Sequence, residues 1–185
     1  MATSSSVKPS QQSWIWWWFM LSSLLVTWDI GYCYLRPRSM PGGDLAWIWA
    51  PYAKYVTVDK IYGFEALETK NGFTNAQTTL NVVETFLNYL YCYLGAKHPL
   101  AVLVGFTSVV MTVSKTLLYW FQEYFCDYCA AGHNSLYDAF WFWMVPNVLW
   151  IVVPGYILYL FAQDLAGSLL VADRATRQLR NGKAQ

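Results

Sequence analysis

The stretch AFWFWMVPNVLWIVVPGYILYLFAQ, residues 139–163, contains no charged side chain. A helix needs roughly 20 apolar residues to cross a bilayer. We therefore predict a transmembrane helix here, with bends at Pro146 and Pro154, because proline interrupts the hydrogen bonding of a helix.

Three further segments have the same apolar character. They extend over residues 12–35, 78–95 and 99–122, and each contains a single charged residue, Asp29, Glu84 and Lys115 respectively. We predict an all-α polytopic membrane protein with one domain over residues 1–185, built as a four-transmembrane-helix bundle. A connection over residues 36–77 and a tail over residues 164–185 complete this prediction.

The composition excludes several other classes of protein. The chain is 56% hydrophobic and 12% charged, whereas soluble domains are about 25% charged. Its 12 Lys and Arg nearly balance 11 Asp and Glu, so no nucleic-acid partner is expected. There is no nucleotide-binding loop, nucleophile elbow or dinucleotide fingerprint. We expect membrane lipids and a lipophilic small molecule as partners and no cofactor; the sequence leaves a homodimer open.

The basic residues indicate the orientation of the helices. Six basic residues lie in the N-terminal segment, the turn at residues 95–99 and the tail: Lys8, Lys97, Arg174, Arg177, Arg180 and Lys183. On the other side, five are spread over the 42-residue connection at residues 36–77 (Arg36, Arg38, Lys54, Lys60 and Lys70), and the loop over residues 123–138 carries no Lys or Arg. Short cytosolic segments are enriched in such residues. We predict that both termini are cytosolic, that the 36–77 connection is not, and that the membrane is that of the endoplasmic reticulum.

Polar residues inside the four segments lie at matching depths. Counted from the non-cytosolic end of each segment, Asp29, Glu84, Lys115 and Asn147 lie about 9 to 12 Å deep at 1.5 Å per residue. Ionisable groups in a membrane are costly and usually face the interior of a bundle. These four residues are therefore expected to share one cavity. The alternative is a structural cluster, in which the charges form ion pairs and Asn147 forms an interhelical hydrogen bond.

Helical spacing adds further residues to this cavity. Asn81, Glu84, Asn88 and Tyr91 share one helix face, and Trp143, Asn147 and Trp150 share another. Lys115 has the alternative of reaching toward the membrane surface with its long side chain. The residues predicted to bind a substrate or a developing cation are Asn147, Trp150, Trp143, Asn88, Tyr91 and Lys115.

A pair of cysteines stands before the last apolar segment. Cys126 and Cys129 enclose two residues, and His133 follows shortly after. Structural zinc needs four ligands, and only three residues of the preferred types are present. We predict no metal site, and a disulfide or two free thiols fit the pattern equally well.

These motifs resemble the emopamil-binding protein family, the EXPERA-type four-helix membrane proteins that include sterol double-bond isomerases. The strongest similarity lies in residues 140–155, with an Asn-x-x-Trp motif followed by Pro-Gly. Further similar stretches are Val83-Glu84-Thr85, Lys97-His98-Pro99-Leu100, Leu118-Tyr119-Trp120 and, as in fungal members, Trp28-Asp29, residues 36–43 and Trp49-Ala50-Pro51-Tyr52.

The resemblance implies roles for individual residues. Asp29 and Glu84 take the places of the acids in the first and second helices, and Asn147 and Trp150 take those of site residues in the fourth. The family is associated with binding amphipathic amines. Sterol isomerases carry a histidine one turn before the first acid, and this chain has Leu25 there. This departure disfavours protonation of an unactivated alkene and favours a substrate that is easier to protonate.

Two acids in a dry cavity are suited to proton transfer. Desolvation favours a neutral carboxylic acid, whereas a carboxylate paired with Lys115 stays ionised. We favour Asp29 as the proton donor and Glu84 as the base or charge stabiliser, with the indole of Trp150 facing the developing cation. The predicted reaction is acid-assisted epoxide opening, by hydrolysis or cyclisation, of a lipophilic polyketide or terpenoid in fungal secondary metabolism. A sterol isomerase-like enzyme and a non-catalytic sterol- or lipid-binding or trafficking protein are the alternatives.

Overall fold

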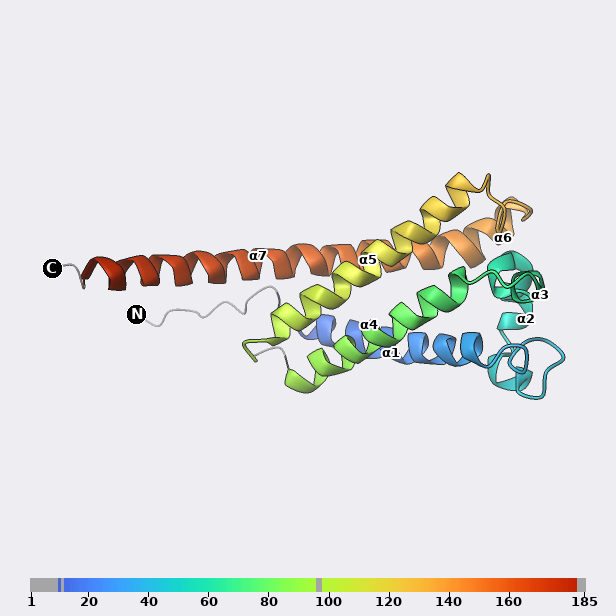
Figure 1. Ribbon diagram of the computed structural model, residues 1–185, viewed down its shortest axis with the longest axis horizontal. Helices are drawn as coiled ribbons and strands as arrows, with labels where there is room; N and C mark the ends of the chain where they lie inside the picture. The colour runs from blue at the N-terminus through green and yellow to red at the C-terminus, as the bar shows by residue number, and fades with distance from the viewer. Residues whose placement is uncertain (1–9, 11, 96–97, 183–185) are drawn as a thin grey trace.

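Four long helices dominate the computed structural model, which describes residues 10, 12–95 and 98–182 (Figure 1). They are α1 (Ser13–Tyr34), α4 (Phe73–Leu94), α5 (Ala101–Phe125) and α7 (Val145–Gly182), and the described residues contain no strand. Part of the predicted 95–99 turn, and Lys8, Lys97 and Lys183 of the orientation argument, lie outside the described residues.

The four helices follow the predicted apolar segments, with different ends. α1 and α5 lie close to the predicted 12–35 and 99–122, and α4 begins at Phe73 rather than at residue 78. α7 does not end at residue 163 but continues to Gly182, beyond the rest of the bundle (Figure 1). Among the described residues, two helical segments, Ala101–Phe125 and Leu136–Asn181, are long and apolar enough to cross a membrane.

The other two long helices have a lower mean hydropathy because of the residues that they contain. α1 is rich in tryptophan and tyrosine, whose polar N–H and O–H groups reduce the hydropathy of large rings. α4 has threonine, asparagine and glutamine along its first half. Both helices nevertheless expose large apolar side chains on the outside of the bundle, including Leu21, Leu24, Val83 and Phe86.

The long helices pack in chain order, α1 with α4, α4 with α5 and α5 with α7. At the crossing of α5 and α7, Gly105 has no side chain to keep the ring of Phe161 away, and an added Cβ would lie 2.5 Å from that ring. α1 contacts α7 through aromatic rings, Trp18 on Trp150 at 5.5 Å and Phe19 on Phe161 at 6.2 Å between centroids. The packed core at the end of the bundle where α1 begins also includes Ile15, Tyr91, Val109, Ile157 and Leu160.

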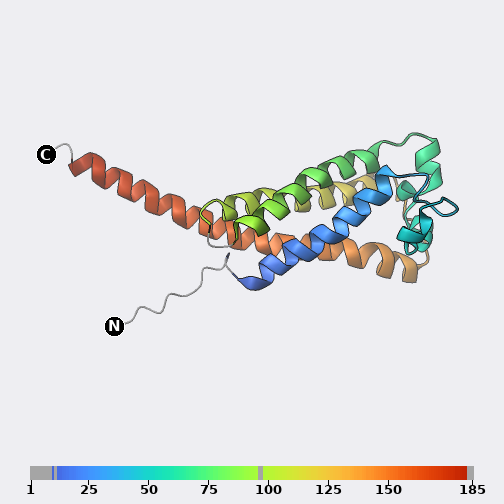
Figure 2. The ribbon, with the colours of Figure 1, turned by 90° about the horizontal axis from the view of Figure 1, so that it is seen from below.

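The connection between α1 and α4 folds into four short helices at the opposite end of the bundle (Figure 2). They are η2 (Ala46–Trp49), α2 (Tyr52–Val58), η3 (Lys60–Tyr62) and α3 (Phe64–Glu68), and we call residues 46–68 the cap. The indole N–H of Trp49 donates to the carbonyl oxygen of Trp28, and that of Trp28 donates to the carbonyl oxygen of Ile48. These two bonds hold the cap against α1.

A widened turn precedes α7. After α6 (Leu136–Asp138), the chain forms the π-helical η4 (Ala139–Met144), in which the N–H of Val145 donates to the carbonyl oxygen of Phe140, five residues back. Pro146 follows directly, and a proline has no N–H and crowds the carbonyl group four residues before it. The wider turn accommodates this proline, whereas Pro154 lies inside α7 without ending the helix.

Candidate functional site

A cavity of about 290 Å³ lies among the four long helices and beneath the cap. Asp29 on α1, Glu84 on α4, Lys115 on α5, and Asn147 and Trp150 on α7 all line it. The four polar residues that were predicted to share one depth are thus brought together in one cavity. The cap contributes Tyr52, Tyr55, Ile61 and Tyr62.

Glu84 forms an ion pair with Lys115. The Nζ atom of Lys115 lies 2.9 Å from Oε2 of Glu84, whose side chain is only 3% exposed, and it also donates to Oδ1 of Asn81. Removing a charge from water is costly unless a partner of opposite sign replaces the lost hydration. The pair therefore gives each buried charge a partner of opposite sign and directs the lysine into the bundle rather than toward a membrane surface.

Asp29 has a different partner. The hydroxyl group of Tyr52 donates to its Oδ1, and no salt bridge among the described residues involves Asp29. The ring of Tyr52 is fixed by Tyr32, at 4.1 Å between centroids, and by the edge of Trp28 at 5.2 Å. Burial and the nearby Asp29 carboxyl raise the pKa of Tyr52, so this phenol remains a hydrogen-bond donor. The two acids of the cavity thus differ in environment, one paired with a cation and one with a hydroxyl group.

The α7 wall of the cavity combines an amide with an indole. The Nδ2 atom of Asn147 donates to the carbonyl oxygen of Trp143 at 2.7 Å, and this bond spans the junction of η4 and α7. Leu25 on α1 lines the cavity and is 55% exposed, and Pro146 on α7 also lines it and is exposed. The cavity therefore reaches the surface of the bundle where α1 faces α7.

Three residues predicted to bind substrate do not line this cavity. Asn88 accepts a hydrogen bond from Ser108, and Tyr91 is packed between Phe19 and Phe161 nearer the other end of the bundle. Trp143 is buried against Trp120, at 4.9 Å between ring centroids. Helical spacing correctly places Asn88 and Tyr91 on an inward, buried face. On α4, however, the lining of the cavity extends from Phe73 to Glu84 and ends one turn before Asn88.

Several cavity residues were missed by the sequence reasoning. Tyr52, Tyr55 and Tyr62 come from the connection that was treated only as a link between helices. Tyr55 also donates to Oδ2 of Asp59, at 3.3 Å, and Asp59 is fully buried. The available signal was the density of aromatic residues between Trp47 and Phe64, which is unusual for a solvated loop.

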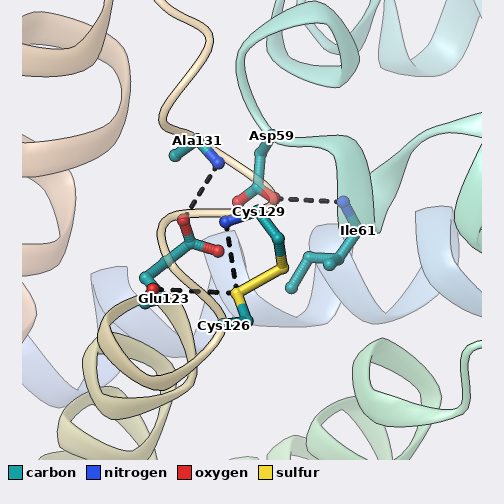
Figure 3. The surroundings of a disulfide bond; sticks show 6 residues. All are labelled: Asp59, Ile61, Glu123, Cys126, Cys129 and Ala131. Carbon is teal, nitrogen blue, oxygen red and sulfur yellow. Dashed lines mark hydrogen bonds between the residues drawn. A yellow bond between two sulfur atoms is a disulfide. The ribbon is translucent and has the colours of Figure 1, made fainter.

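Cys126 and Cys129 form a disulfide near the cap (Figure 3). This settles the alternative that the sequence left open between a disulfide and two thiols. Glu123 and the two sulfur atoms lie within 4.8 Å of one another. Zinc binds cysteine as the thiolate, and a disulfide offers none. His133 contacts the carbonyl oxygen of Thr57, at 2.8 Å.

Comparisons with known proteins do not assign the chain to a family. No protein-family model, curated protein or solved structure matches it.

Proposed function

We propose that the chain is a four-span protein of the endoplasmic reticulum membrane with both termini in the cytosol. α1 and α4 contain 22 residues each and α5 contains 25, and roughly 20 residues suffice to cross a bilayer. The start of α1 and the free end of α7 lie at one end of the bundle, and the cap lies at the other (Figure 1). Large apolar side chains on the outer surface support contact with lipid.

Within this bundle, we propose an enzyme that opens an epoxide with acid assistance. The observation that carries the proposal is the pairing of Lys115 with Glu84 and not with Asp29. Pairs of acids whose environments differ commonly divide into a proton donor and a charged partner. Asp29 is then the donor, and Glu84 is the base or charge stabiliser.

The proposed reaction follows from these two roles. Asp29 transfers its proton to the epoxide oxygen as a carbon–oxygen bond breaks, which leaves positive charge on carbon. The indole face of Trp150 stabilises that charge by about 0.5 to 2 kcal/mol. Glu84 accepts the proton of the water or internal hydroxyl group that attacks the carbon, so that hydrolysis or cyclisation completes the reaction. Tyr52 orients Asp29 through its hydrogen bond.

The substrate is proposed to be a lipophilic polyketide or terpenoid. The cavity, at about 290 Å³, lies just below the range of roughly 300 to 1,000 Å³ for small-molecule sites. It therefore suits the reacting part of a lipophile whose remainder extends out of the cavity. The exposed edge at Leu25 and Pro146 gives such a molecule a route from the bilayer.

The resemblance to the emopamil-binding protein family remains part of this proposal. Leu25 lines the cavity, so the position that resembles the histidine of sterol isomerases contributes no proton acceptor to it. This argues against sterol isomerisation and for the easier protonation of an epoxide. Secondary metabolism in a fungus is the setting that the resemblance implies.

The test uses microsomes that contain the protein, supplied with a polyene epoxide or with a sterol precursor. Asp29→Asn is expected to lower epoxide turnover about 10²- to 10⁴-fold, the range for a lost proton donor. Asparagine retains an Oδ1 that accepts from Tyr52, so folded protein and binding of an amphipathic amine are expected to persist. Asp173→Asn, an exposed change on the far part of α7, is the control.

Each other outcome has a defined meaning. Conversion of the sterol precursor alone would replace the epoxide proposal with the isomerase. Amine binding without turnover of either compound would favour a lipid-binding protein. Loss of folded protein in Asp29→Asn would make the acids a structural cluster.

A further inference from the structure

The disulfide between Cys126 and Cys129 (Figure 3) is not part of the lining of the cavity and takes no part in the reaction proposed above. It closes a ring with a sequence separation of 3, at the point where α5 ends. Crosslinks stabilise a fold mainly by closing long loops, so a ring this short contributes little stability. The bond therefore contributes little as a structural crosslink.

The loop that carries the disulfide is held by other contacts. Asn134 donates from Nδ2 to the carbonyl oxygen of Val58 at 2.7 Å, and the N–H of Lys60 donates to the carbonyl oxygen of Ala130 at 3.2 Å. His133 adds its contact with Thr57 at 2.8 Å. These bonds attach the loop to the cap without the disulfide, so the sulfur atoms are free to change state while the loop stays in place.

The residues inside the ring favour its opening. Asp127 and Tyr128 have φ values of 55° and 58°, in the left-handed region that residues with a Cβ atom rarely adopt. Two consecutive residues of this kind store backbone strain. Reduction of the disulfide allows both residues to relax.

The two sulfur atoms differ in access and in hydrogen bonding. Cys129 is exposed, whereas Cys126 is half-buried. The backbone N–H of Cys129 donates to Sγ of Cys126 at 3.2 Å. Hydrogen bonds of this kind strengthen when the acceptor becomes charged. An incoming thiolate therefore reaches Cys129, and the sulfur that leaves as a thiolate is Cys126.

A buried acid stands beside both sulfurs. The side chain of Glu123 is 3% exposed, its carboxylate lies within 4.8 Å of both Sγ atoms, and Oε2 accepts from the N–H of Ala131 at 2.9 Å. No salt bridge among the described residues neutralises this carboxyl. It is placed to exchange a proton with the thiol of Cys126.

We propose that Cys126 and Cys129 form a site of thiol–disulfide exchange, independent of the cavity, whose substrates are cysteine thiols. A substrate thiolate attacks Sγ of Cys129, which forms a mixed disulfide and releases Cys126 as a thiolate that takes up a proton. A second substrate thiolate then attacks the substrate sulfur of the mixed disulfide and releases Cys129. Two thiols are oxidised to one disulfide, and the protein disulfide is reduced to two thiols.

In the reverse direction, Cys126 resolves the mixed disulfide. Glu123 accepts the proton of the Cys126 thiol, the resulting thiolate attacks Sγ of Cys129, and the substrate thiolate leaves. The exchange is therefore reversible, and its direction is set by the ratio of thiols to disulfides on that side of the membrane.

The test uses the folded full-length protein in detergent and glutathione as the probe, with thiols counted by a maleimide that shifts the protein on a gel. Excess reduced glutathione is expected to give two new thiols in the native protein, and oxidised glutathione to remove them. With oxidised glutathione, Cys126→Ser is expected to accumulate a glutathione mixed disulfide on Cys129, with release of one reduced glutathione, because the resolving sulfur is missing. Cys129→Ser leaves only the half-buried sulfur and is expected to react much more slowly. Cys92→Ser, in α4, is the control and should behave as the wild type.

Glu123→Gln tests the proton transfer. Glutamine keeps an oxygen that accepts from Ala131, so the loop is retained, but release of glutathione from the mixed disulfide is expected to slow about 10-fold or more. Glu65→Gln, an exposed change on α3, is its control.

Reduction of the wild-type disulfide only after unfolding, or equal glutathionylation of both cysteine variants, would overturn the proposal. An unchanged release rate in Glu123→Gln would remove Glu123 from it. Epoxide turnover is measured separately, so failure of either proposal leaves the other standing.

Discussion

Glu84 and Lys115 form the charged centre of the cavity, and the cost of separating them can be measured. Removing one partner of a buried pair leaves an uncompensated charge, which typically costs about 3 to 5 kcal/mol. Lys115→Met is therefore expected to lower the free energy of unfolding in detergent by about that amount, because Glu84 is 3% exposed. The double variant Glu84→Gln/Lys115→Met is expected to recover most of the loss. A single variant as stable as the wild type would contradict a stabilising role for this ion pair.

The buried Asp59, in the cap, is expected to make the stability of the protein depend on pH. Burial raises the pKa of Asp59 from 3.8 to about 7, and the nearby Glu123 carboxylate contributes to the rise. The folded protein then binds more protons than the unfolded chain between about pH 4 and pH 7, so stability falls as the pH rises through that window. The slope is at most about 1.4 kcal/mol per pH unit.

Asp59→Asn removes this group and is expected to flatten the dependence of the melting temperature on pH between pH 4 and 7. The amide can still accept from the N–H of Ile61, as Oδ1 of Asp59 does at 3.2 Å. Melting curves at several pH values check this, and Asp44→Asn, in an exposed pair with Arg38, is the control. An unchanged slope in Asp59→Asn would assign the pH dependence to another group.

Individual residues differ in how far the sequence predicted them. Asp29, Glu84, Lys115 and Asn147 were placed at one level because a helix has a fixed rise per residue, and all four line the cavity. Lys115 pairs with Glu84 and not with Asp29. This pairing depends on where the side chains lie in three dimensions, which helical spacing alone does not give. Tyr52 could not be assigned to Asp29, because no local pattern links a residue of the cap to a residue of α1.

At the level of elements, the close approach of α5 and α7 depends on a single glycine. A Cβ atom at Gly105 would lie 2.5 Å from the ring of Phe161 and 3.0 Å from that of Tyr91, two rings that are themselves buried. Gly105→Ala is expected to lower the stability by about 1 to 2 kcal/mol, because overpacking outweighs the helix propensity that alanine adds.

Gly155, on α7, is the matched control for this change. A Cβ atom there has no neighbour within 4 Å, so Gly155→Ala is expected to leave stability unchanged or to raise it by up to about 1 kcal/mol. Thermal unfolding of the two variants in the same detergent compares them. Equal effects at both positions would mean that α5 and α7 do not cross where Gly105 lies.

The elements also show where sequence reasoning reaches its limit. Hydrophobic segments located the four long helices to within a few residues, except for the far end of α7, which continues as a charged and exposed helix that hydropathy does not mark. The cap could not be predicted, since its position depends on contacts such as Trp49 with Trp28 between residues distant in sequence. The π-helical turn before Pro146 likewise results from local crowding rather than from periodicity.

For the whole molecule, the arrangement of the long helices determines which residues lie on the same side of a membrane. α1 begins, and α7 extends freely, at the end of the bundle opposite the cap (Figures 1 and 2). A chain that crosses the membrane four times must therefore have Arg180 on one side and Glu68, in the cap, on the other. If only α5 and the segment Leu136–Asn181 crossed the membrane, residues before α5 and residues at the end of α7 would share one side.

Labelling with a membrane-impermeant maleimide separates these two arrangements, because both positions are exposed. In sealed microsomes, Arg180→Cys is expected to react at once, and Glu68→Cys only after the membrane is permeabilised. Cys126 and Cys129 remain oxidised in this assay, and the parent protein corrects for the remaining thiols of Cys33 and Cys92. Equal labelling of both variants in sealed vesicles would leave α1 and α4 outside the bilayer. The cavity would then lie open to water, and the dry environment that the proposed proton transfer from Asp29 requires would be lost.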